Sequence, residues 1–388
     1  AGLVGTAEEL LAYPAAYFGG RRRIDVRHHV QVTELDPDGH TVGYRQGGRS
    51  HRLGYGRLVV TAGGTPIRPA LDGVRSDRVF TIRTLEDAIA LRSLLDAGRV
   101  GHALVVGAGY IGLEMAEAFA ARGCAVTVVE RLDRVLPGFD EPIASAVEAN
   151  VREHVDLRLG TDVGTALDPP PDVVVLATGV RPQTSVAAEC GARTGPAGAL
   201  LVDSRMRTSL PDVWAAGDCI APHHRVLGRP AFVPLGPTAN KTGRVAGTVA
   251  AGGDAEFGGM VGTAVVKVFD LEVARTGLSA ADAEAAGIAA HATDVVHRTR
   301  AKYYPGSAEL HVRLVHGEGG RLLGAQMVGR EGAAKRIDVV AAALQAGMTV
   351  ADLLGLDLSY APPFAPVYDP LLIAAQAADR TLRALEAV

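Results

Sequence analysis

The chain has 388 residues, of which 48% are hydrophobic and 21% are charged, and its formal net charge at pH 7 is −4. This length predicts two or three domains, and a weakly acidic chain without a basic block argues against a nucleic-acid partner. The chain shows no signal peptide and no apolar run near the roughly 20 residues of a membrane helix, so we expect no membrane partner.

The first hundred residues alternate between helical and strand patterns. AEELLAYPAAYF predicts a helix with Thr6 as N-cap. Residues 24–63 predict three short antiparallel strands, IDVRHHVQVTEL, HTVGYR and LVVTAGG, separated by the turns DPDG and QGG. TLEDAIALRSLLDAG then predicts a helix that Thr84 caps and Gly98 ends.

Two different sheets are predicted for the rest of the chain. The apolar runs at 104–109, 125–130 and 172–179, with helical segments between them, are typical of a parallel sheet covered on both faces. From about Gly262, TAVVKVFDLEVARTG, ELHVRLVH and RLLGAQMVG predict antiparallel strands, followed by the helix EGAAKRIDVVAAALQAG and a helix that Asp369 and Pro370 begin. The fold class is therefore α/β with a C-terminal α+β domain.

GAGYIG at 107–112 matches the G-x-G-x-x-G turn of dinucleotide-binding folds, between a strand and a helix. Gly107 suits the tight turn, Gly109 lets the backbone approach a pyrophosphate, and Gly112 permits close helix–strand packing. Glu130 ends the next strand, where a carboxylate accepts hydrogen bonds from a ribose 2′-hydroxyl and repels a 2′-phosphate, so NADH is favoured over NADPH. Arg131 is near enough to keep NADPH open, and a glycine turn without ligand is the alternative.

The cysteines and histidines do not form a metal site in this sequence. Cys124, Cys190 and Cys219 lack paired spacing, which favours a reducing, cytoplasmic setting over a disulfide framework. Neighbouring strand residues face opposite ways, so His28–His29 and His223–His224 are poor ligand pairs. Cys219 follows PDVWAAGD, a strand that ends in the pair Gly217 and Asp218. We interpret Cys219 as structural.

Three motifs, GAGYIGLEMAE, ATGVRPQT and TSLPDVWAAGDC, together resemble the pyridine nucleotide–disulfide oxidoreductases. The resemblance covers the whole chain and implies a homodimeric flavoprotein that uses FAD with NADH or NADPH. It implies an FAD-binding domain at 1–86 and 202–256, an inserted Rossmann-like NAD(P)-binding domain at 87–201, and a dimerisation domain at 257–388. AKYYPGS, KRIDVVAAAL and YAPPF are most similar to coenzyme A-disulfide reductases, with NADH oxidases and peroxidases as close relatives.

The resemblance also implies roles for individual residues. Asp218 would hold the ribityl chain of FAD, Tyr110 would cover the flavin and swing aside for nicotinamide, and Tyr303 and Tyr360 would reach the substrate pocket of the other subunit. Asn240 would abut the substrate. The further cofactor-binding residues implied are Thr61, Ala62, Gly63, Gly107, Gly109, Ile111, Gly112, Glu114, Glu130, Gly179 and Gly217.

One part of the family pattern is missing from the sequence. The strand–GxGxxG–helix unit for the FAD pyrophosphate and the redox-active cysteine would both lie before Ala1, so we expect an N-terminally truncated FAD-binding domain that holds little or no FAD. The resemblance predicts an enzyme that passes electrons from NAD(P)H through flavin to a small-thiol disulfide, most of all coenzyme A disulfide. The alternatives are oxygen or peroxide as acceptor, and a non-catalytic protein that binds NAD and dimerises.

Overall fold

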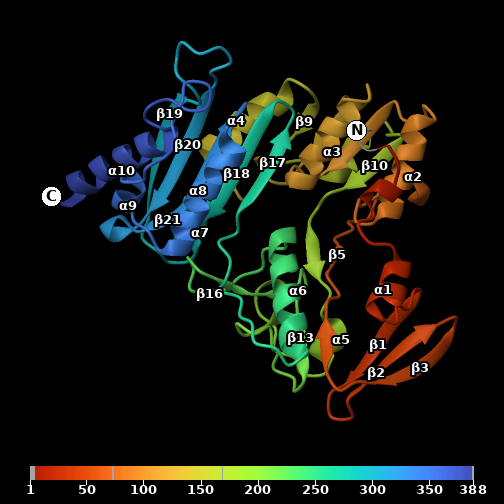
Figure 1. Ribbon diagram of the computed structural model, residues 1–388. Helices are drawn as coiled ribbons and strands as arrows, with labels where there is room; N and C mark the ends of the chain where they lie inside the picture. The colour runs from red at the N-terminus through yellow and green to blue at the C-terminus, as the bar shows by residue number, and fades with distance from the viewer. Residues whose placement is uncertain (1–4, 72–73, 168, 387–388) are drawn as a thin grey trace.

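The computed structural model describes residues 5–71, 74–167 and 169–386, arranged as three groups of elements (Figure 1). We call them the parallel-sheet unit, the antiparallel-sheet unit and the lower unit. Ala1, the basis of the predicted truncation, lies outside the described residues. Among the described residues, no helix is both long enough and apolar enough to cross a membrane.

The parallel-sheet unit confirms the predicted α/β arrangement. Its five strands run parallel in the order β6-β10-β7-β8-β9. Side chains of β7 alternate between two cores, with Ala103 and Val105 in one and Leu104 and Val106 in the other, so both faces are covered. The strands are β6 (Val79–Phe80), β7 (His102–Val106), β8 (Ala125–Val129), β9 (Asp156–Arg158) and β10 (Val173–Leu176). The helices are α2 (Leu85–Asp96), α3 (Tyr110–Ala120) and α4 (Glu141–Arg152).

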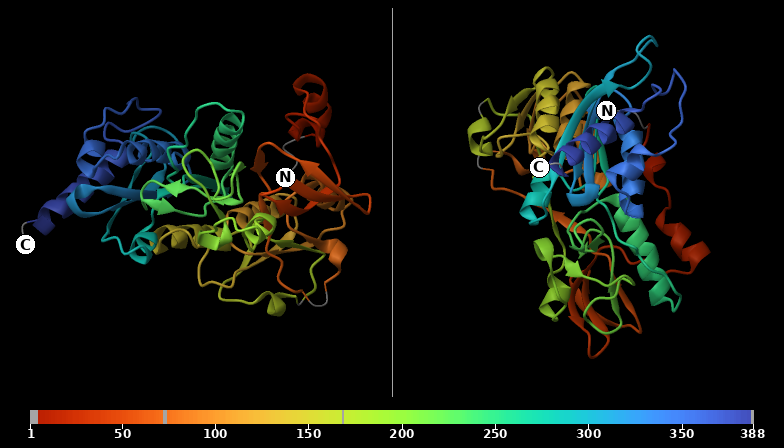
Figure 2. Two further views of the ribbon diagram at one scale, coloured as in Figure 1. Left: turned by 90° about the horizontal axis from the view of Figure 1, so that it is seen from below. Right: turned by 90° about the vertical axis from the view of Figure 1, so that its left-hand side faces the viewer.

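The antiparallel-sheet unit has the strand order β17-β18-β21-β20-β19, and α8 and α10 contact its strands. The sequence did not predict the edge strand β19, whose side chains are all exposed or half-buried. Helix α10 projects from this unit at one end of the molecule (Figure 2). The strands are β17 (Ala264–Val268), β18 (Leu271–Gly277), β19 (His291–Arg298), β20 (Glu309–His316) and β21 (Leu322–Gly329). The helices are α7 (Ala280–Ala285), α8 (Ala333–Ala346), α9 (Val350–Leu354) and α10 (Pro370–Glu386).

The lower unit corrects two predicted elements. The third strand of the meander is RSHRLG, not LVVTAGG, because LVV pairs in parallel with VWA. The helix predicted from Thr6 is a 3₁₀ turn, Glu8–Leu10, and a separate helix, because a chain entering Pro14 leaves the helical conformation. The elements are α1 (Ala15–Arg22), β1 (Val30–Asp36), β2 (Thr41–Gln46), β3 (Arg49–Gly54), β4 (Leu58–Val60), α5 (Ser185–Glu189), β13 (Val213–Ala215) and α6 (Gly236–Ala250).

Short strands connect the units. The chain leaves the lower unit through β5 (Gly64–Pro66) and returns through β11 (Val180–Pro182), which pairs with β5 in antiparallel fashion. The backbone N–H of Gln183 donates to the carbonyl of Gly63 at 2.8 Å. The remaining short strands are β12 (Leu200–Leu201), β14 (Ile220–Ala221), β15 (His223–His224) and β16 (Arg229–Pro230).

A buried carboxylate joins the two five-stranded units. Asp140, 6% exposed, accepts hydrogen bonds from Arg313 Nε and Gln326 Nε2, each at 3.0 Å. The same carboxylate accepts from the backbone N–H groups of Ala280 and Ala281 at the start of α7. A buried charge with this many partners is a specific contact, so the loop before α4 is held against the antiparallel sheet.

Candidate functional site

The turn between β7 and α3 has the geometry that the glycine spacing predicts. Gly107 has a φ of +106°, and a Cβ on it would lie 2.5 Å from the carbonyl oxygen of Ala177. A Cβ on Gly112 would lie 1.8 Å from the carbonyl oxygen of Gly107, so helix and turn are too close for any side chain there. A Cβ on Gly109 would meet nothing within 4 Å, so this backbone faces open space. The turn therefore leaves a free approach at Gly109.

That open space is a pocket of about 480 Å³ at the carboxyl ends of β7, β8 and β10, which we call the glycine-turn pocket. Gly107, Gly109, Glu130 and Gly179 all line it, so the fold brings together residues from three separate segments of the sequence. Ile111 lies in the first turn of α3 and is 47% exposed. Free N–H groups at a helix start and a concave glycine backbone suit a phosphate group.

Glu130 holds the turn as well as lining the pocket. Its Oε2 accepts a hydrogen bond from the Ala108 N–H at 2.8 Å, and its Oε1 accepts one from the Leu132 N–H at 3.0 Å. A carboxylate has about four lone-pair positions, so two stay available for ribose hydroxyls. The sequence did not predict this second role.

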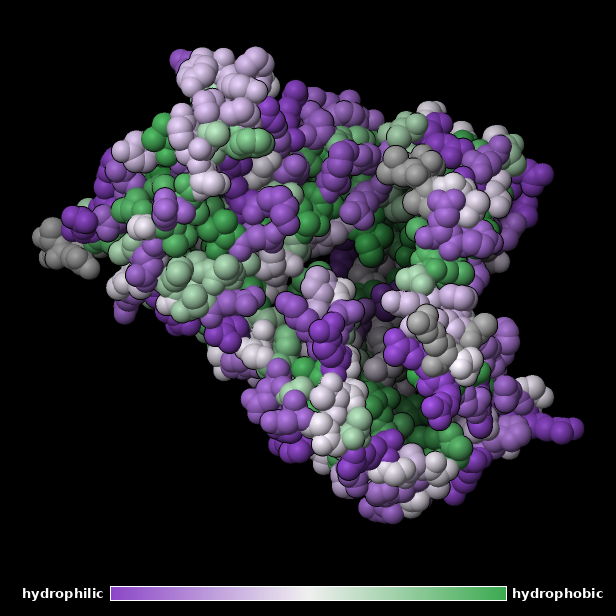
Figure 3. Space-filling view, in the orientation of Figure 1, coloured by the Kyte–Doolittle hydropathy of each residue, from purple (hydrophilic) through white to green (hydrophobic). Residues whose placement is uncertain are grey.

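A second cavity, of about 500 Å³, lies beside Tyr110 where the three units meet; we call it the Tyr110 cavity. The Tyr110 ring centroid is 6.1 Å from that of Phe139, and burial raises the pKa of its hydroxyl. Arg275 pairs with Asp282 at 2.6 Å on the cavity wall and donates to the carbonyl of Gly138. Figure 3 shows that the surface is hollowed between the two five-stranded units and the lower unit.

The pKa values of two titratable groups near Tyr110 are shifted in the direction of the neutral form. Burial lowers the pKa of His224 to about 4, and Arg275 acts in the same direction. Desolvation and the charge of Glu117 raise the pKa of Glu114, one turn along α3 from Tyr110. Both effects disfavour isolated charge beside the cavity.

The carboxyl ends of β4 and β13 lie side by side and form what we call the strand-end site, made of Thr61–Gly63, Gly217, Asp218 and Arg83. Gly63 and Gly217 have φ of +68° and +82°. Asp218 pairs with Arg83 at 3.1 Å, and a Cβ on Gly63 would lie 3.2 Å from Arg83 Nη2. Sequence reasoning missed Arg83; a lone arginine directly before the N-cap Thr84 was the available signal.

The three cysteines are free. Cys219 is fully buried, and burial raises the pKa of its thiol. Burial also raises the pKa of Cys124, and Cys190 Sγ donates to the Leu35 carbonyl at 2.8 Å. This burial fits the interpretation of Cys219 as structural.

Three predicted residues, Tyr303, Tyr360 and Asn240, do not line the glycine-turn pocket or the Tyr110 cavity. Tyr303 and Tyr360 are 76% and 48% exposed and lie together, since desolvation and a hydrogen bond with Tyr303 raise the pKa of Tyr360. The loop between β19 and β20 that carries Tyr303 lies at the opposite end of the molecule from β13 (Figure 1). Asn240 is exposed on the first turns of α6. In the described part of the chain no cluster of His, Cys, Asp and Glu could hold a metal ion.

Comparison with known proteins gives matches over most of the chain. The family model "Pyridine nucleotide-disulphide oxidoreductase" matches residues 6–243, and the dimerisation-domain model of the same family matches residues 263–370. The NAD(P)H sulfur oxidoreductase (CoA-dependent) of Pyrococcus abyssi is 39% identical over 96% of this chain and 86% of its own length. The NADH oxidase of Methanocaldococcus jannaschii is 32% identical over 98% of this chain and 88% of its own length.

A solved structure agrees with this assignment. The NAD-dependent persulfide reductase from A. fulgidus superimposes with a TM-score of 0.89 at 36% identity, covering 95% of this chain and 71% of that one. The resemblance inferred from the motifs is therefore confirmed. The chain belongs to the pyridine nucleotide-disulphide oxidoreductases, a family of FAD-dependent enzymes that use NAD(P)H.

Proposed function

We propose that this protein takes a hydride from NAD(P)H and delivers two electrons to a small-thiol disulfide or persulfide, most of all one of coenzyme A. The balanced reaction for a disulfide is NAD(P)H + H⁺ + RSSR → NAD(P)⁺ + 2 RSH. The observation that carries the proposal is that the paired strands β5 and β11 connect the strand-end site, which ends at Gly63, to the glycine-turn pocket, which Ile67 and Gly179 line. The CoA-dependent activity in the name of the Pyrococcus relative supports the choice of acceptor.

The glycine-turn pocket would hold the dinucleotide. Gly107, Gly109 and Gly112 bring the backbone and the α3 N-terminus to the pyrophosphate, and Gly179 lines the far wall. Glu130 would accept from the ribose 2′-hydroxyl, which favours NADH. Arg131 also lines this pocket and would be the partner of a 2′-phosphate if NADPH binds.

The residues of the strand-end site fit part of FAD, which supplies the two-electron carrier between nicotinamide and acceptor when bound. The carboxylate of Asp218 suits the ribityl hydroxyls, Arg83 suits a phosphate, and the glycine backbone at 63 and 217 admits close approach. We propose that Thr61 and Ala62 line the same group. Tyr110, with Ile111 and Glu114 on the same helix, would cover the flavin ring and move aside for nicotinamide.

The working unit we propose is the homodimer, which the matched dimerisation domain supports. Tyr303 and Tyr360 would act at the partner subunit's substrate pocket, and Asn240 would border that pocket from α6.

We propose the division into domains at 1–86 with 202–256, 87–201 and 257–388, although β6 precedes residue 87 and still joins the parallel sheet. None of Cys124, Cys190 and Cys219 is proposed as the redox thiol. The free cysteines favour a reducing, cytoplasmic setting.

The test is NADH consumption by the purified protein, recorded together with its flavin absorbance and the release of free thiol. We expect coenzyme A disulfide to drive NADH oxidation by the flavin-loaded protein, with two thiols released per NADH. Equal or faster turnover with oxygen alone would make the protein an oxidase, the activity named for the Methanocaldococcus relative. NADH binding without bound flavin and without turnover would instead make it a non-catalytic binding protein.

A further inference from the structure

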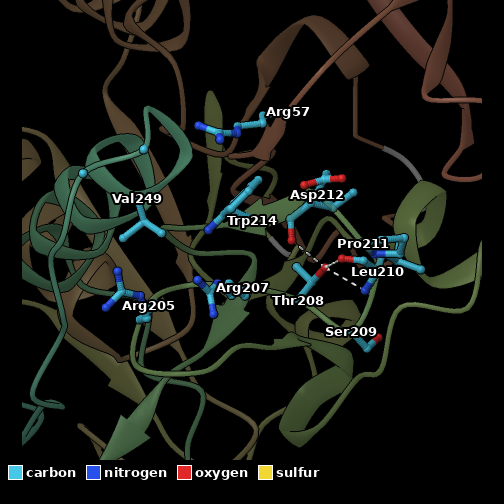
Figure 4. A pocket seen from close by; sticks show the side chains of 13 residues that line it. Arg57, Arg205, Arg207, Thr208, Ser209, Leu210, Pro211, Asp212, Trp214 and Val249 are labelled. Atoms are coloured by element: carbon cyan, nitrogen blue, oxygen red, sulfur yellow. Dashed lines mark hydrogen bonds between the residues drawn. The ribbon is translucent and has the colours of Figure 1, made fainter.

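A pocket of about 650 Å³ lies at the amino ends of β4 and β13, the opposite edge from the strand-end site (Figure 4). We call it the arginine pocket because Arg57, Arg205 and Arg207 line it together with Trp214. The three arginines come from two segments that are about 150 residues apart in the sequence and that meet where β4 pairs with β13. None of them belongs to the sites described above.

The positive charge of this pocket is only partly neutralised. Arg205 Nη1 pairs with Asp254 at 2.5 Å and with Glu256 at 3.8 Å, and Arg57 Nη1 donates to the Ala250 carbonyl at 2.7 Å. The exposed guanidinium of Arg207 makes no ion pair or hydrogen bond within the described residues. Asp212 is the acidic residue of the wall, and it faces His40 at 3.8 Å.

The wall also contains two buried donors without an acceptor. Trp214 is 7% exposed, and its Nε1 is buried with no hydrogen-bond partner. Arg205 Nε is also buried and has no hydrogen-bond partner. Figure 4 shows the indole between Arg57 and Arg207, with its nitrogen on the side of Arg205 and Arg207. Buried donors are almost always paired, so two in one wall indicate that an acceptor belongs there.

The hydroxyl groups of the wall accept hydrogen bonds from the backbone and not from these two donors. Thr208 Oγ1 donates to the Val213 carbonyl at 2.8 Å and accepts from the Leu210 N–H. Ser209 Oγ accepts from the Arg193 N–H at 2.8 Å. The wall therefore has an excess of donors and of positive charge.

We propose that the arginine pocket binds a small phosphate-bearing molecule. A phosphate group offers several acceptor oxygens to donors from different directions, and arginine forks match it geometrically. Arg207 and Arg57 make the first contacts, and the group sits against Trp214 and Arg205. Both nitrogens are buried although their residues line the pocket, so we expect binding to shift the indole.

The test uses the fluorescence of Trp214, which is the only tryptophan of the sequence, with inorganic pyrophosphate as the probe. We expect a saturable change in the full-length protein at constant ionic strength. Arg207→Gln should weaken binding by about ten-fold or more, because a charge-assisted contact is lost. Arg380→Gln, an exposed arginine on α10, is the matched control and should leave the affinity unchanged.

Three outcomes would overturn the proposal. They are the absence of a saturable change, an equal affinity in Arg207→Gln and the unsubstituted protein, and tighter binding of citrate than of pyrophosphate. Gly109→Ala separates this site from the glycine-turn pocket: pyrophosphate affinity should stay unchanged, and its loss would assign the signal to that other pocket. Calorimetry with Trp214→Phe, which removes the indole donor, should show several-fold weaker binding.

Discussion

At the scale of single residues, Glu130 combines two tasks in one carboxylate. It holds the backbone at Ala108 and Leu132 and faces the glycine-turn pocket. We expect Glu130→Gln to keep the fold and to raise the NADPH-to-NADH affinity ratio by about ten-fold, because one negative charge no longer repels a 2′-phosphate. Equilibrium titration with both coenzymes measures the ratio. An unchanged ratio would contradict the role proposed for this carboxylate.

His224 gives a prediction about pH. Its pKa is 6.5 in the unfolded chain and about 4 in the folded one, so the unfolded state binds the extra proton first. His224 therefore contributes about 3 kcal/mol to the free energy of unfolding at neutral pH. This contribution is complete above pH 6.5 and is lost as the pH falls towards 4. Denaturant unfolding across this window should show a weaker pH dependence for His224→Gln. His28→Gln, at an exposed position, should retain the original slope.

Residue-level prediction from the sequence succeeded where a motif fixes the geometry and failed where the partner is remote. Gly107, Gly109 and Gly112 were predictable because one turn contains all three. Arg83 was not, because its partner Asp218 is 135 residues away. The arginine pocket was missed for the same reason, since the pairing of β4 with β13 creates it.

At the scale of the element, the turn into α3 contains one glycine that we expect the fold to require and another that we expect only coenzyme binding to require. Gly112→Ala should cost about 2 kcal/mol of unfolding free energy, because its Cβ would lie 1.8 Å from the Gly107 carbonyl oxygen. Gly109→Ala should unfold like the unsubstituted protein and yet bind NADH at least about ten-fold more weakly, because its Cβ fills the approach to the pyrophosphate. Unfolding curves and NADH titrations of the pair test this. Equal effects of both substitutions on binding and stability would refute the division.

The elements themselves were predictable in proportion to their burial. The three central strands of the parallel sheet, β7, β8 and β10, stood out as continuous apolar runs because both faces are covered, whereas the shorter strands β6 and β9 were not predicted. β3 was missed because every residue of RSHRLG is exposed, so the strand carries no apolar pattern. LVVTAGG was assigned to the wrong sheet because its sequence does not specify the strand with which it pairs.

At the scale of the whole molecule, Asp140 links the two five-stranded units. We expect Asp140→Asn to lower the unfolding free energy by about 3 kcal/mol, because Arg313 stays buried with one carboxylate fewer. Asp133→Asn removes an exposed pair with Arg134 and should change stability by less than about 0.5 kcal/mol. Denaturant titration compares the two. Contacts of this kind between units could not be predicted from the sequence, because they depend on how two folded sheets pack against each other.

The pairing of β5 with β11 has a consequence for how enzymes of this kind can recombine. The chain leaves the lower unit at Gly64 and returns at Gln183, whose N–H donates to the Gly63 carbonyl, so both crossing points lie at one place. Residues 64–182 therefore form a cassette that a gene exchange can replace without stretching the remainder. We expect coenzyme preference to travel with the cassette, which contains Glu130, and acceptor choice to stay with the remainder of the chain. An incoming cassette must, however, supply a carboxylate for Arg313 where Asp140 now lies.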